Sequence, residues 1–515
     1  MKKFASMISI IIALMMLFSL TAFAGEAEQD PKYVEHMNVV IDNTQIAAIN
    51  PIGSGGPGSA TGWVYLMVYD TLVAFDDNTG EYSPNLATSW EWEGDDWTTV
   101  IFHLRDDVVF SNGEPFTAAD VVFTIEQALL NPGSVAGGTY QTVASAEALD
   151  DYTVKLTLQS PKPQILFDCA SELGGIMCKK AVEEDPEKGV WIGTGAFKIT
   201  DFGTNDFVEL ERNDLYWGEP VPTKSMSLRY IPEMSTRLMM LMNGEADICF
   251  NLSEQDLDLV MADPEHFKTF EYLQNNNSDI GFNMNDPLCG DLNFRMAVAS
   301  AINRADIALG GAGIYAVPET TGTFWGSGEA FRNTDIPIIP YDLEKAKEYL
   351  AASPYNGEEV ELITAIPTMI NASAVIQNQL AEIGINVVIK QTDPASLMAA
   401  CSYGSTEYQM YAFVGAFGFE PYSSTLGIFG KAAMQNRATY DNEEVQAILE
   451  KAATETDPEI QKEYYYKIQE LVAQDIPYIN LFNMKQVISA LNSVDGLKIA
   501  NDGGHDLRYM YKLAE

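Results

Sequence analysis

The sequence predicts an α/β protein built of two lobes, and a repeated unit of strands and helix carries this prediction. One unit covers residues 226–250 and the other covers residues 360–389. Each has an apolar strand, a helix with apolar residues at helical spacing, a glycine and a second strand. Gly244 and Gly384 stand where the two helices are expected to end. Because each unit needs a sheet core of its own, two units in one chain favour two α/β lobes.

Alternation of apolar and polar residues predicts further strands, mostly in the first half of the chain. Apolar residues at every second position after a Glu-Gly-Asp-Asp turn predict a hairpin over residues 90–110. The same alternation predicts a strand at 154–158 and a second hairpin at 197–210. The region before Lys179 is therefore expected to be rich in strands.

Capping residues predict where several helices begin. Thr117 is followed three positions later by Asp120 and then by apolar residues at helical spacing, which is typical of a capping box. Asp342, Asp441 and Asp457 each precede an apolar stripe of the same spacing. We interpret these stripes as faces that pack into a core.

The first 24 residues predict export from the cytoplasm. Lys2 and Lys3 precede an apolar run at 7–20, and a small-x-small pattern ends at Ala24. The run is shorter than the roughly 20 apolar residues of a membrane-spanning helix. We therefore expect residues 1–24 to be a cleaved signal peptide. Since no cysteine stands near the cleavage point, we expect a periplasmic, extracellular or cell-surface protein without a lipid anchor.

The charge of the chain argues against nucleic acid as a partner. Its 515 residues include 73 Asp and Glu but 30 Lys and Arg, for a formal net charge of −43. Phosphate binding needs clustered basic residues, and an anionic membrane surface would also repel this chain. We interpret the acidic residues as a solubilising surface spread over the molecule.

Cysteine and histidine give no support for a metal site. The four histidines, at positions 36, 103, 266 and 505, form no ligand set of helical or CxxC-like spacing. Of the five cysteines, Cys169 and Cys178 are close enough in sequence for a disulfide, and buried free thiols are the alternative. We expect neither a metal nor a cofactor.

No enzyme motif is present. The glycine-rich segment 50–58 lacks the Gly-Lys-Ser/Thr ending of a P-loop and the GxGxxG spacing of a dinucleotide turn. The sequence also has no GxSxG and no HExxH. We therefore expect a protein that is not an enzyme, with a secreted hydrolase as the alternative from another class.

A series of segments, in the same order along the chain, resembles the extracellular solute-binding proteins of family 5, the oligopeptide- and dipeptide-binding receptors of ABC importers. Each segment alone is weak, but the series covers nearly the whole chain after the signal. The segments are VYDTL at 68–72, PNLATSW at 84–90, FHLR at 102–105, NGEPFTAADV at 112–121, GTGAFK at 193–198, LERN at 210–213, YWG at 216–218, TRL at 236–238, GEADI at 244–248, GFN at 281–283, and the stretches 295–307, 342–350 and 380–385.

The resemblance implies a type II periplasmic-binding-protein fold, in which an extra strand-rich subdomain is inserted into the first lobe. We expect lobe I to comprise 25–278 and 485–515, with the subdomain at about 55–178, and lobe II to comprise 279–484. The chain would cross between the lobes near 275–280 and near 482–486.

The resemblance also implies a function. The protein is expected to be the extracytoplasmic substrate-binding component of an ABC importer, a monomer that traps a small solute between its lobes and delivers it to the permease subunits. An oligopeptide is the favoured solute, and an uncharged sugar or other small molecule is the alternative. A nickel or haem carrier and a sensor that reports to a membrane receptor are further readings.

Two anchors that the resemblance implies for a peptide's termini are missing. The aspartate expected four residues before Pro421 is replaced by Phe417, and no arginine occurs in 364–368 to hold a carboxylate. A buried terminal charge without a partner is costly. A longer or neutral ligand therefore fits better, and Glu420 is a hypothetical substitute for the missing aspartate.

The ligand-binding candidates are aromatic, acidic or glycine residues near the expected cleft. The aromatic candidates are interpreted equally well as core residues. The candidates are Tyr140, Trp325, Tyr411, Gly415, Phe417, Gly418 and Glu420.

Overall fold

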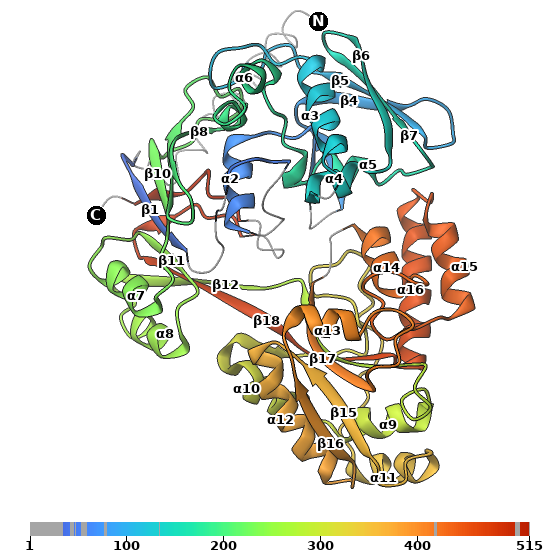
Figure 1. The fold of residues 1–515 in the computed structure, drawn as a ribbon. Coiled ribbons are helices and arrows are strands. Elements are labelled where there is room, and N and C mark those ends of the chain that lie inside the picture. Colours follow the sequence, from blue (N-terminus) through green and yellow to red (C-terminus); the bar gives the residue numbers. More distant parts are fainter. Residues whose placement is uncertain are drawn as a thin grey trace, which may run out of the picture.

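The protein consists of two α/β lobes joined by long strands (Figure 1). The computed structural model describes residues 34–41, 46, 48–52, 59–76, 80–132, 134–416, 420–499 and 505–513, without the side chains of residues 135 and 416. The predicted signal peptide lies outside the described residues. The mixed α/β architecture confirms the fold class predicted from the sequence.

The first lobe contains a mixed sheet around the N-terminal strand. Its β10 and β11 form the first predicted strand-helix-strand unit, and both run parallel to β1, which lies between them. Gly244 has a φ of +70°, a conformation that favours glycine, and follows the last turn of α7. The elements are β1 (Met37–Ile41), α2 (Ala60–Val68), β8 (Phe197–Gly203), β9 (Phe207–Arg212), β10 (Ser225–Tyr230), α7 (Met234–Met242), β11 (Ile248–Phe250), α8 (Glu254–Met261), β12 (Phe267–Leu273), β19 (Val494–Asp495) and β20 (Tyr511–Lys512).

A strand-rich subdomain with its own apolar core belongs to this lobe. The predicted hairpins are confirmed, because β4 pairs antiparallel with β5 and β8 pairs antiparallel with β9. The capping box is also confirmed, since the Thr117 backbone N–H donates to the Asp120 carboxylate at 2.9 Å. The elements are β2 (Val73–Asp76), β3 (Glu81–Pro84), β4 (Ala87–Trp92), β5 (Thr99–Leu104), α3 (Ala118–Leu130), α4 (Val135–Tyr140), β6 (Val143–Asp150), β7 (Thr153–Leu158), α5 (Ile165–Asp168), the 3-10 helices η1 (Glu172–Gly174) and η2 (Gly189–Trp191), and α6 (Lys179–Glu184).

The second lobe has a sheet in the order β16-β15-β17-β13-β18. One face packs on α9, α10 and α12, and the other packs on the C-terminal helices. The second predicted unit is confirmed as β15, α12 and β16. The elements are β13 (Asn276–Phe282), α9 (Leu292–Ala301), α10 (Arg304–Ala312), η3 (Gly313–Tyr315), β14 (Ala316–Pro318), α11 (Leu343–Ala352), β15 (Glu359–Thr364), α12 (Pro367–Ala381), β16 (Asn386–Gln391), α13 (Pro394–Ala400), β17 (Met410–Ala416), α14 (Pro421–Phe429), α15 (Glu443–Ala452) and α16 (Pro458–Asp475).

The structure confirms two of the three helix starts predicted from aspartates in the C-terminal part of the chain and corrects the third. Asp342 and Asp457 cap α11 and α16 as expected, each accepting from a backbone N–H of the first turn. The prediction that Asp441 opens α15 is wrong, because Asn442 is the cap and accepts from two backbone N–H groups. The carboxylate of Asp441 instead forms an ion pair with Lys431 at 2.6 Å.

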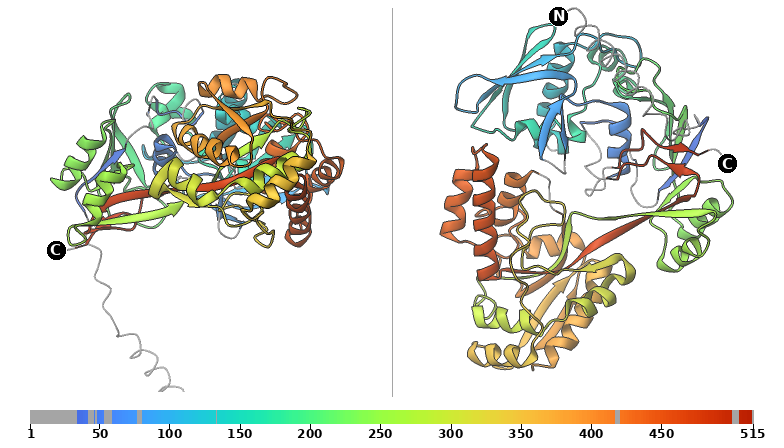
Figure 2. Two further views of the ribbon diagram at one scale, coloured as in Figure 1. Left: turned by 90° about the horizontal axis from the view of Figure 1, so that it is seen from below. Right: turned by 180° about the vertical axis from the view of Figure 1, so that it is seen from behind.

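Strand β18 (Tyr478–Leu491) passes from one lobe to the other. Its first part pairs with β13 and β14, and its last part pairs with β11 and β12. Figure 2 shows this strand, in red, crossing the molecule beside β12. The lobe boundaries at 278/279 and 484/485 and the limits of the subdomain stay predictions.

Candidate ligand-binding site

Segments that carry the family resemblance meet inside the first lobe. The Asp70 carboxylate accepts hydrogen bonds from the Thr194 hydroxyl at 2.9 Å and from the indole N–H of Trp217 at 2.8 Å. The guanidinium of Arg105 lies over the Trp217 ring, 4.4 Å from its centroid. Burial raises the pKa of Asp70, and the two hydrogen bonds oppose that rise. These residues hold four segments of the lobe together.

In the second lobe, side chains of the segments that carry the resemblance donate hydrogen bonds to backbone carbonyls. The side chain of Asn283 donates to the carbonyl of Tyr408 at 2.9 Å. Arg295 donates to the carbonyl of Asp475, and Arg304 donates to that of Asn480, both at 2.9 Å. The described contacts of the residues that carry the resemblance are therefore structural. The ligand site lies elsewhere.

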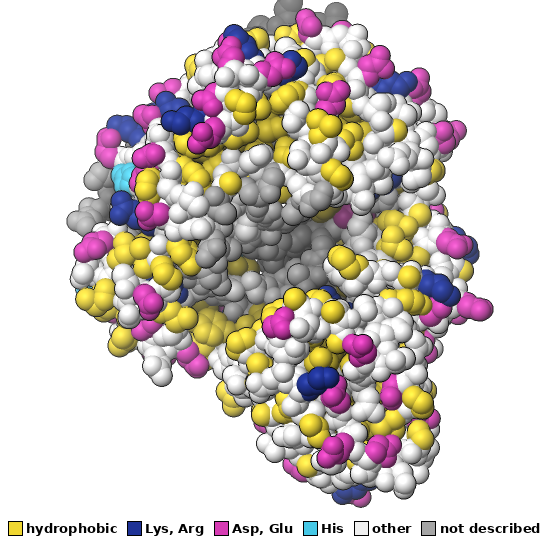
Figure 3. Space-filling view, in the orientation of Figure 1, with side chains coloured by type: hydrophobic (Ala, Val, Ile, Leu, Met, Phe, Trp, Pro, Cys, Tyr) yellow, Lys and Arg dark blue, Asp and Glu magenta, His cyan; other side chains and the backbone are white. Residues whose placement is uncertain are grey.

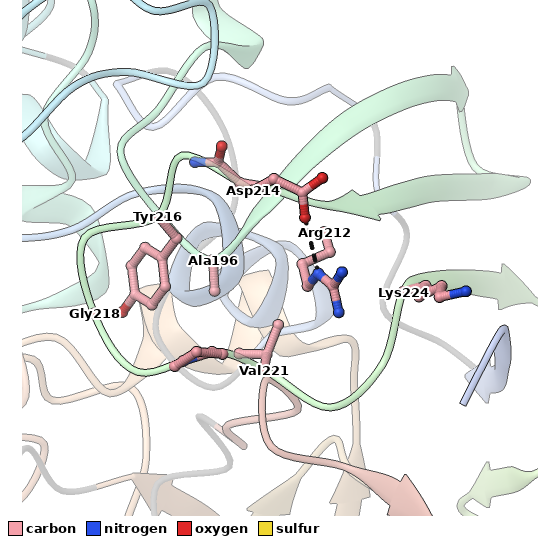
Figure 4. A pocket seen from close by; sticks show the side chains of 9 residues that line it. Ala196, Arg212, Asp214, Tyr216, Gly218, Val221 and Lys224 are labelled. Carbon is pink, nitrogen blue, oxygen red and sulfur yellow. Dashed lines mark hydrogen bonds and ion pairs between the residues drawn. The ribbon is translucent and has the colours of Figure 1, made fainter. Parts of the chain in front are cut away.

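A cavity of about 510 Å³ opens on the first lobe beside these segments (Figure 4). The side chain of Arg212 points toward Asp214 across its mouth, with the ion pair at 3.1 Å. Tyr216 and Val221 form the apolar part of the lining. Arg212 pairs with Asp214, Lys224 pairs with Glu35, and the lining residues that the structure describes all belong to the first lobe. This cavity therefore does not have the arrangement of a site closed by two lobes.

The two lobes contact each other at both ends of the space between them. Near the crossing strands, the Tyr315 hydroxyl donates to the carbonyl of Leu252 at 2.7 Å. At the far rim, the side-chain amide of Gln164 donates to the carbonyl of Ala453 at 3.1 Å. Figure 3 shows the face of the molecule hollowed between its upper and lower parts. A solute enclosed here would touch both lobes.

The second lobe turns the carboxyl edge of its sheet toward this hollow. The parallel strands β15 and β17 end there, at Thr364 and Ala416, and the antiparallel β13 begins there at Asn276. Ligands of open α/β sheets bind outside the carboxyl ends of the strands. Topology therefore places the candidate site at this edge.

Buried polar atoms gather at the same edge. The Oδ1 of Asn277, the Oδ2 of Asp279 and the Oγ1 of Thr364 have no hydrogen-bond partner among the described residues. Asn277 and Thr364 are fully buried, and Asp279 is 2% exposed. Unpaired buried polar atoms are rare in folded proteins because their desolvation is not compensated. Asn277 and Asp279 share one face of β13, while Thr364 lies level with Ile280 on the other face, and these atoms make this end of the sheet the candidate site.

Asp279 is the most perturbed group of this set. Burial raises the pKa of its carboxyl to about 7, and the nearby positive charge of Arg437 and a hydrogen bond from Tyr411 oppose that rise. The Arg437 guanidinium itself lies over the Phe413 ring, 4.6 Å from the centroid. Near neutral pH, a change in the surroundings of this carboxyl can therefore change its ionisation state.

A second group of acids lies where β17 leads into α14. Glu420 caps α14, and its two oxygens accept from the backbone N–H groups of Tyr422 at 3.1 Å and Ser423 at 2.6 Å. Burial raises the pKa of Glu420, and the negative charge of Asp168 in the first lobe adds to the rise. Glu329, which accepts from Ser424 at 2.7 Å, has its pKa raised by burial to about 8.

The structure distributes the predicted site residues over several places. Tyr140 is buried in the subdomain core, and Trp325 is buried and stacked on Phe429 with ring centroids 4.9 Å apart. Both side chains belong to apolar cores in this conformation. Their roles in binding stay predictions.

Other predicted residues lie at the candidate edge. Tyr411 and Gly415 lie on β17 beside Asp279, and Glu420 follows. Phe417 and Gly418 lie outside the described residues. The roles of all five in binding stay predictions.

Sequence reasoning missed Asn277, Asp279, Thr364 and Glu329. The sequence predicts only a crossing between the lobes near 275–280, and the polar run Asn275–Asp279 is buried within or beside β13. Five successive polar residues that continue as a strand are the available signal, since a buried polar strand needs partners. Thr364 and Glu329 carried no such signal.

The described residues contain no group of three or more His, Cys, Asp or Glu side chains arranged to hold a metal ion. All five cysteines are buried free thiols. Within the described ranges, no helix has both the length and the apolar character needed to cross a membrane.

Comparison with known proteins places this architecture in a family. Residues 81–436 match the model of the bacterial extracellular solute-binding proteins, family 5. The chain is 26% identical to heme-binding protein A of Haemophilus influenzae, over 80% of this chain and 81% of the relative. It is 24% identical to the peptide transport periplasmic protein SapA of the same organism, over 89% and 90%. The structure of HbpA2 from Haemophilus parasuis superposes with a TM-score of 0.83 at 22% identity, covering 93% of this chain and all of that one. The chain therefore belongs to the family 5 bacterial extracellular solute-binding proteins and has their two-lobed type II fold.

Proposed function

We propose that this protein is the substrate-binding component of an ABC importer and that it encloses an oligopeptide between its lobes. The observation that carries the proposal is the set of buried polar atoms without a described partner near the carboxyl ends of the second lobe's strands, on the side toward the first lobe (Figure 1). The relative SapA, a peptide transport protein, supports the choice of a peptide. The family supports binding rather than catalysis.

A peptide fits the chemistry of this edge. The unpaired atoms of Asn277, Asp279 and Thr364 include acceptors that a peptide's N–H groups can satisfy. Asn480 and Asn483, on the crossing strand, add two more unpaired Oδ1 atoms. The acidic surroundings favour a solute that carries a positive charge over an anionic one. A sugar could satisfy the amides through its hydroxyls but would bring no positive charge to the carboxyls.

Transport would follow from closure of the lobes on the solute. A ligand that touches both lobes binds the closed form more tightly and so shifts the equilibrium toward it. The permease subunits would then recognise the closed form. The contacts at Gln164 and Tyr315 supply surfaces on which the lobes can meet.

We also propose that the chain acts outside the cytoplasmic membrane, after cleavage behind Ala24. The family of extracellular binding proteins supports this location. Mass spectrometry of the exported protein is expected to find Gly25 at the new N-terminus. A retained leader would reject the cleavage site.

A thermal-shift screen tests the solute class. Purified mature protein is mixed with peptide pools of two to ten residues, with neutral sugars, with nickel salts and with haem. A ligand at a hundred times its Kd stabilises a protein by about 2.7 kcal/mol, which is readily measured. We expect a shift with peptides, to be confirmed by calorimetric titration. Shifts only with sugars, nickel or haem would reject the peptide, and release of product from peptides would reject the binding role.

A further inference from the structure

Open space lies beside the buried carboxyl of Asp279. Asp279 pairs directly with Phe413 on β17, and Gly415 lies two positions further along that strand, on the same face. Of the described atoms, Asp279 Oδ1 alone lies within 4 Å of the point that a Cβ at position 415 would occupy, at 3.9 Å. Among the residues that the structure describes, the absence of a side chain at Gly415 therefore leaves a niche against the carboxyl group.

The strand register places Gly415 between Asp279 and the carboxyl end of β17, which is the side of the cleft. Asn277 pairs with Gly415, Asp279 pairs with Phe413, and Gly281 pairs with Tyr411. Residues two apart share a face of a sheet. Along this face Tyr411 packs in the core, and Gly415 lies two pairs beyond Asp279 toward the carboxyl edge. A group that enters over the edge meets Gly415 first and Asp279 next.

The surroundings leave the carboxyl only partly compensated. The positive charge of Arg437 and a hydrogen bond from Tyr411 oppose the effect of burial on its pKa, and its own negative charge raises the pKa of Tyr478. The guanidinium of Arg437 is engaged by the Phe413 ring and by the sulfur of Met398, 3.4 Å from its Nε. The Oδ2 of Asp279 has no partner among the described residues. A buried carboxylate in this state is stabilised by an incoming cation.

We propose that Asp279 and Gly415 form a niche that binds a positively charged group of the solute, an ammonium or guanidinium. The inference rests on the proposed function and makes it more specific, because it selects cationic solutes among peptides. The charged group can belong to the peptide's N-terminus or to a lysine or arginine side chain. The two sources share one chemistry, and the experiment separates them.

Four peptides of one length and one parent sequence test the niche, after the screen has supplied the parent. They combine a free or acetylated N-terminus with a lysine or a norleucine side chain. Their affinities are measured by calorimetry for the wild type, Asp279→Asn and Asp335→Asn. Asp335 is an exposed aspartate of the same lobe and serves as the matched control.

We expect the wild type and Asp335→Asn to prefer the charged peptides, and Asp279→Asn to lose at least about tenfold of affinity for them. Its affinity for the acetylated norleucine peptide should stay within about twofold. If the loss follows the N-terminus, the ammonium is the occupant, and if it follows lysine, the side chain is. Equal losses for all four peptides would overturn the niche and leave Asp279 a structural partner of Arg437.

A second variant tests the niche even if Asp279→Asn does not fold. Gly415→Leu retains the carboxyl but fills the space beside it, and the extended strand tolerates a side chain there. We expect the same selective loss for charged peptides. Unchanged affinity in Gly415→Leu would overturn the niche. A wild type that binds peptides without preference for charge would also overturn it, whereas a wild type that binds no peptide refutes the proposed function itself.

Discussion

The side-chain amide of Gln164 donates a hydrogen bond to the carbonyl of Ala453, and this 3.1 Å contact joins the two lobes at the rim of the cleft. Gln164 stands at the start of α5 in the first lobe and is 7% exposed, while Ala453 ends α15 in the second. The bond lies on the opposite side of the hollow from the crossing strands. It therefore stabilises the arrangement in which the lobes meet.

Replacing Gln164 with alanine is expected to weaken ligand binding. A hydrogen bond of this kind contributes about 0.5–1.5 kcal/mol, so its loss lowers the population of the closed form and weakens apparent affinity by about two- to tenfold. Small-angle scattering should show a larger radius of gyration without ligand. Gln159→Ala is the matched control, because Gln159 donates at the same distance to the Gln141 carbonyl within the first lobe. Equal effects of the two variants would contradict a role at the rim.

Stability is expected to fall as pH rises, because two buried carboxyls have raised pKa values. The pKa of Asp279 is about 7 in the folded protein against an ordinary 3.8, and that of Glu329 is about 8 against 4.5. Between these values the folded state binds more protons than the unfolded state, so each group lowers the free energy of unfolding as pH rises through that interval. The loss is complete only about one pH unit above the folded pKa of Glu329.

Glu329→Gln and Asp279→Asn are therefore expected to raise the free energy of unfolding at pH 8 by about 1–3 kcal/mol and to leave it nearly unchanged at pH 4. Chemical denaturation at both pH values measures the difference. Asp335→Asn, at an exposed position, should shift neither value. A variant that destabilises the protein equally at both pH values would show that the carboxyl is fully compensated in the folded state.

Asp70 is predicted to matter for stability and not for binding. Asp70→Ala removes the acceptor of Thr194 and Trp217 and leaves their donors unpaired, at a cost of about 2–4 kcal/mol. Urea denaturation should show this loss, while calorimetry on the remaining folded protein should find the wild-type affinity. A large drop in affinity at unchanged stability would place Asp70 in the binding machinery instead.

Local patterns predicted the elements of the fold well. The alternation that marks β4 and β5, the capping box at Thr117 and the glycine that ends α7 each depend on neighbouring residues, and each is confirmed. The helix start at Asp441 failed by one residue because Asp and Asn are equally good caps. Short-range chemistry was therefore sufficient to predict elements, and less so their boundaries.

The candidate site could not be predicted in the same way. Its atoms come from strands about 90 and 140 residues apart in sequence, with Asp279 on β13, Thr364 on β15 and Gly415 on β17. Strand order brings them to one edge, and no local pattern encodes that order. The aromatic residues chosen from the sequence fit either ligand binding or core packing, and Trp325 and Tyr140 lie in cores. Burial of an unpaired polar atom, which marks the site, becomes visible only in the folded chain.

Glu420 gives the sharpest test of the rim acids. Its carboxylate already accepts two backbone N–H groups of α14, and the negative Asp168 lies near it across the cleft. An ammonium between the two acids would relieve their repulsion. We therefore expect Glu420→Gln to reduce affinity for a peptide with a free N-terminus by about three- to tenfold, and to reduce affinity for its acetylated form less.

The amide variant separates charge from capping. Glutamine keeps one acceptor oxygen for the N-terminus of α14, so Glu420→Gln should cost about 1 kcal/mol of stability or less, whereas Glu420→Ala should cost up to about 2 kcal/mol. Equal losses of affinity for free and acetylated peptides would mean that Glu420 acts only as a cap. A preference for a free N-terminus that disappears in Asp279→Asn and persists in Glu420→Gln would place the ammonium in the niche beside Asp279 and not beside Glu420.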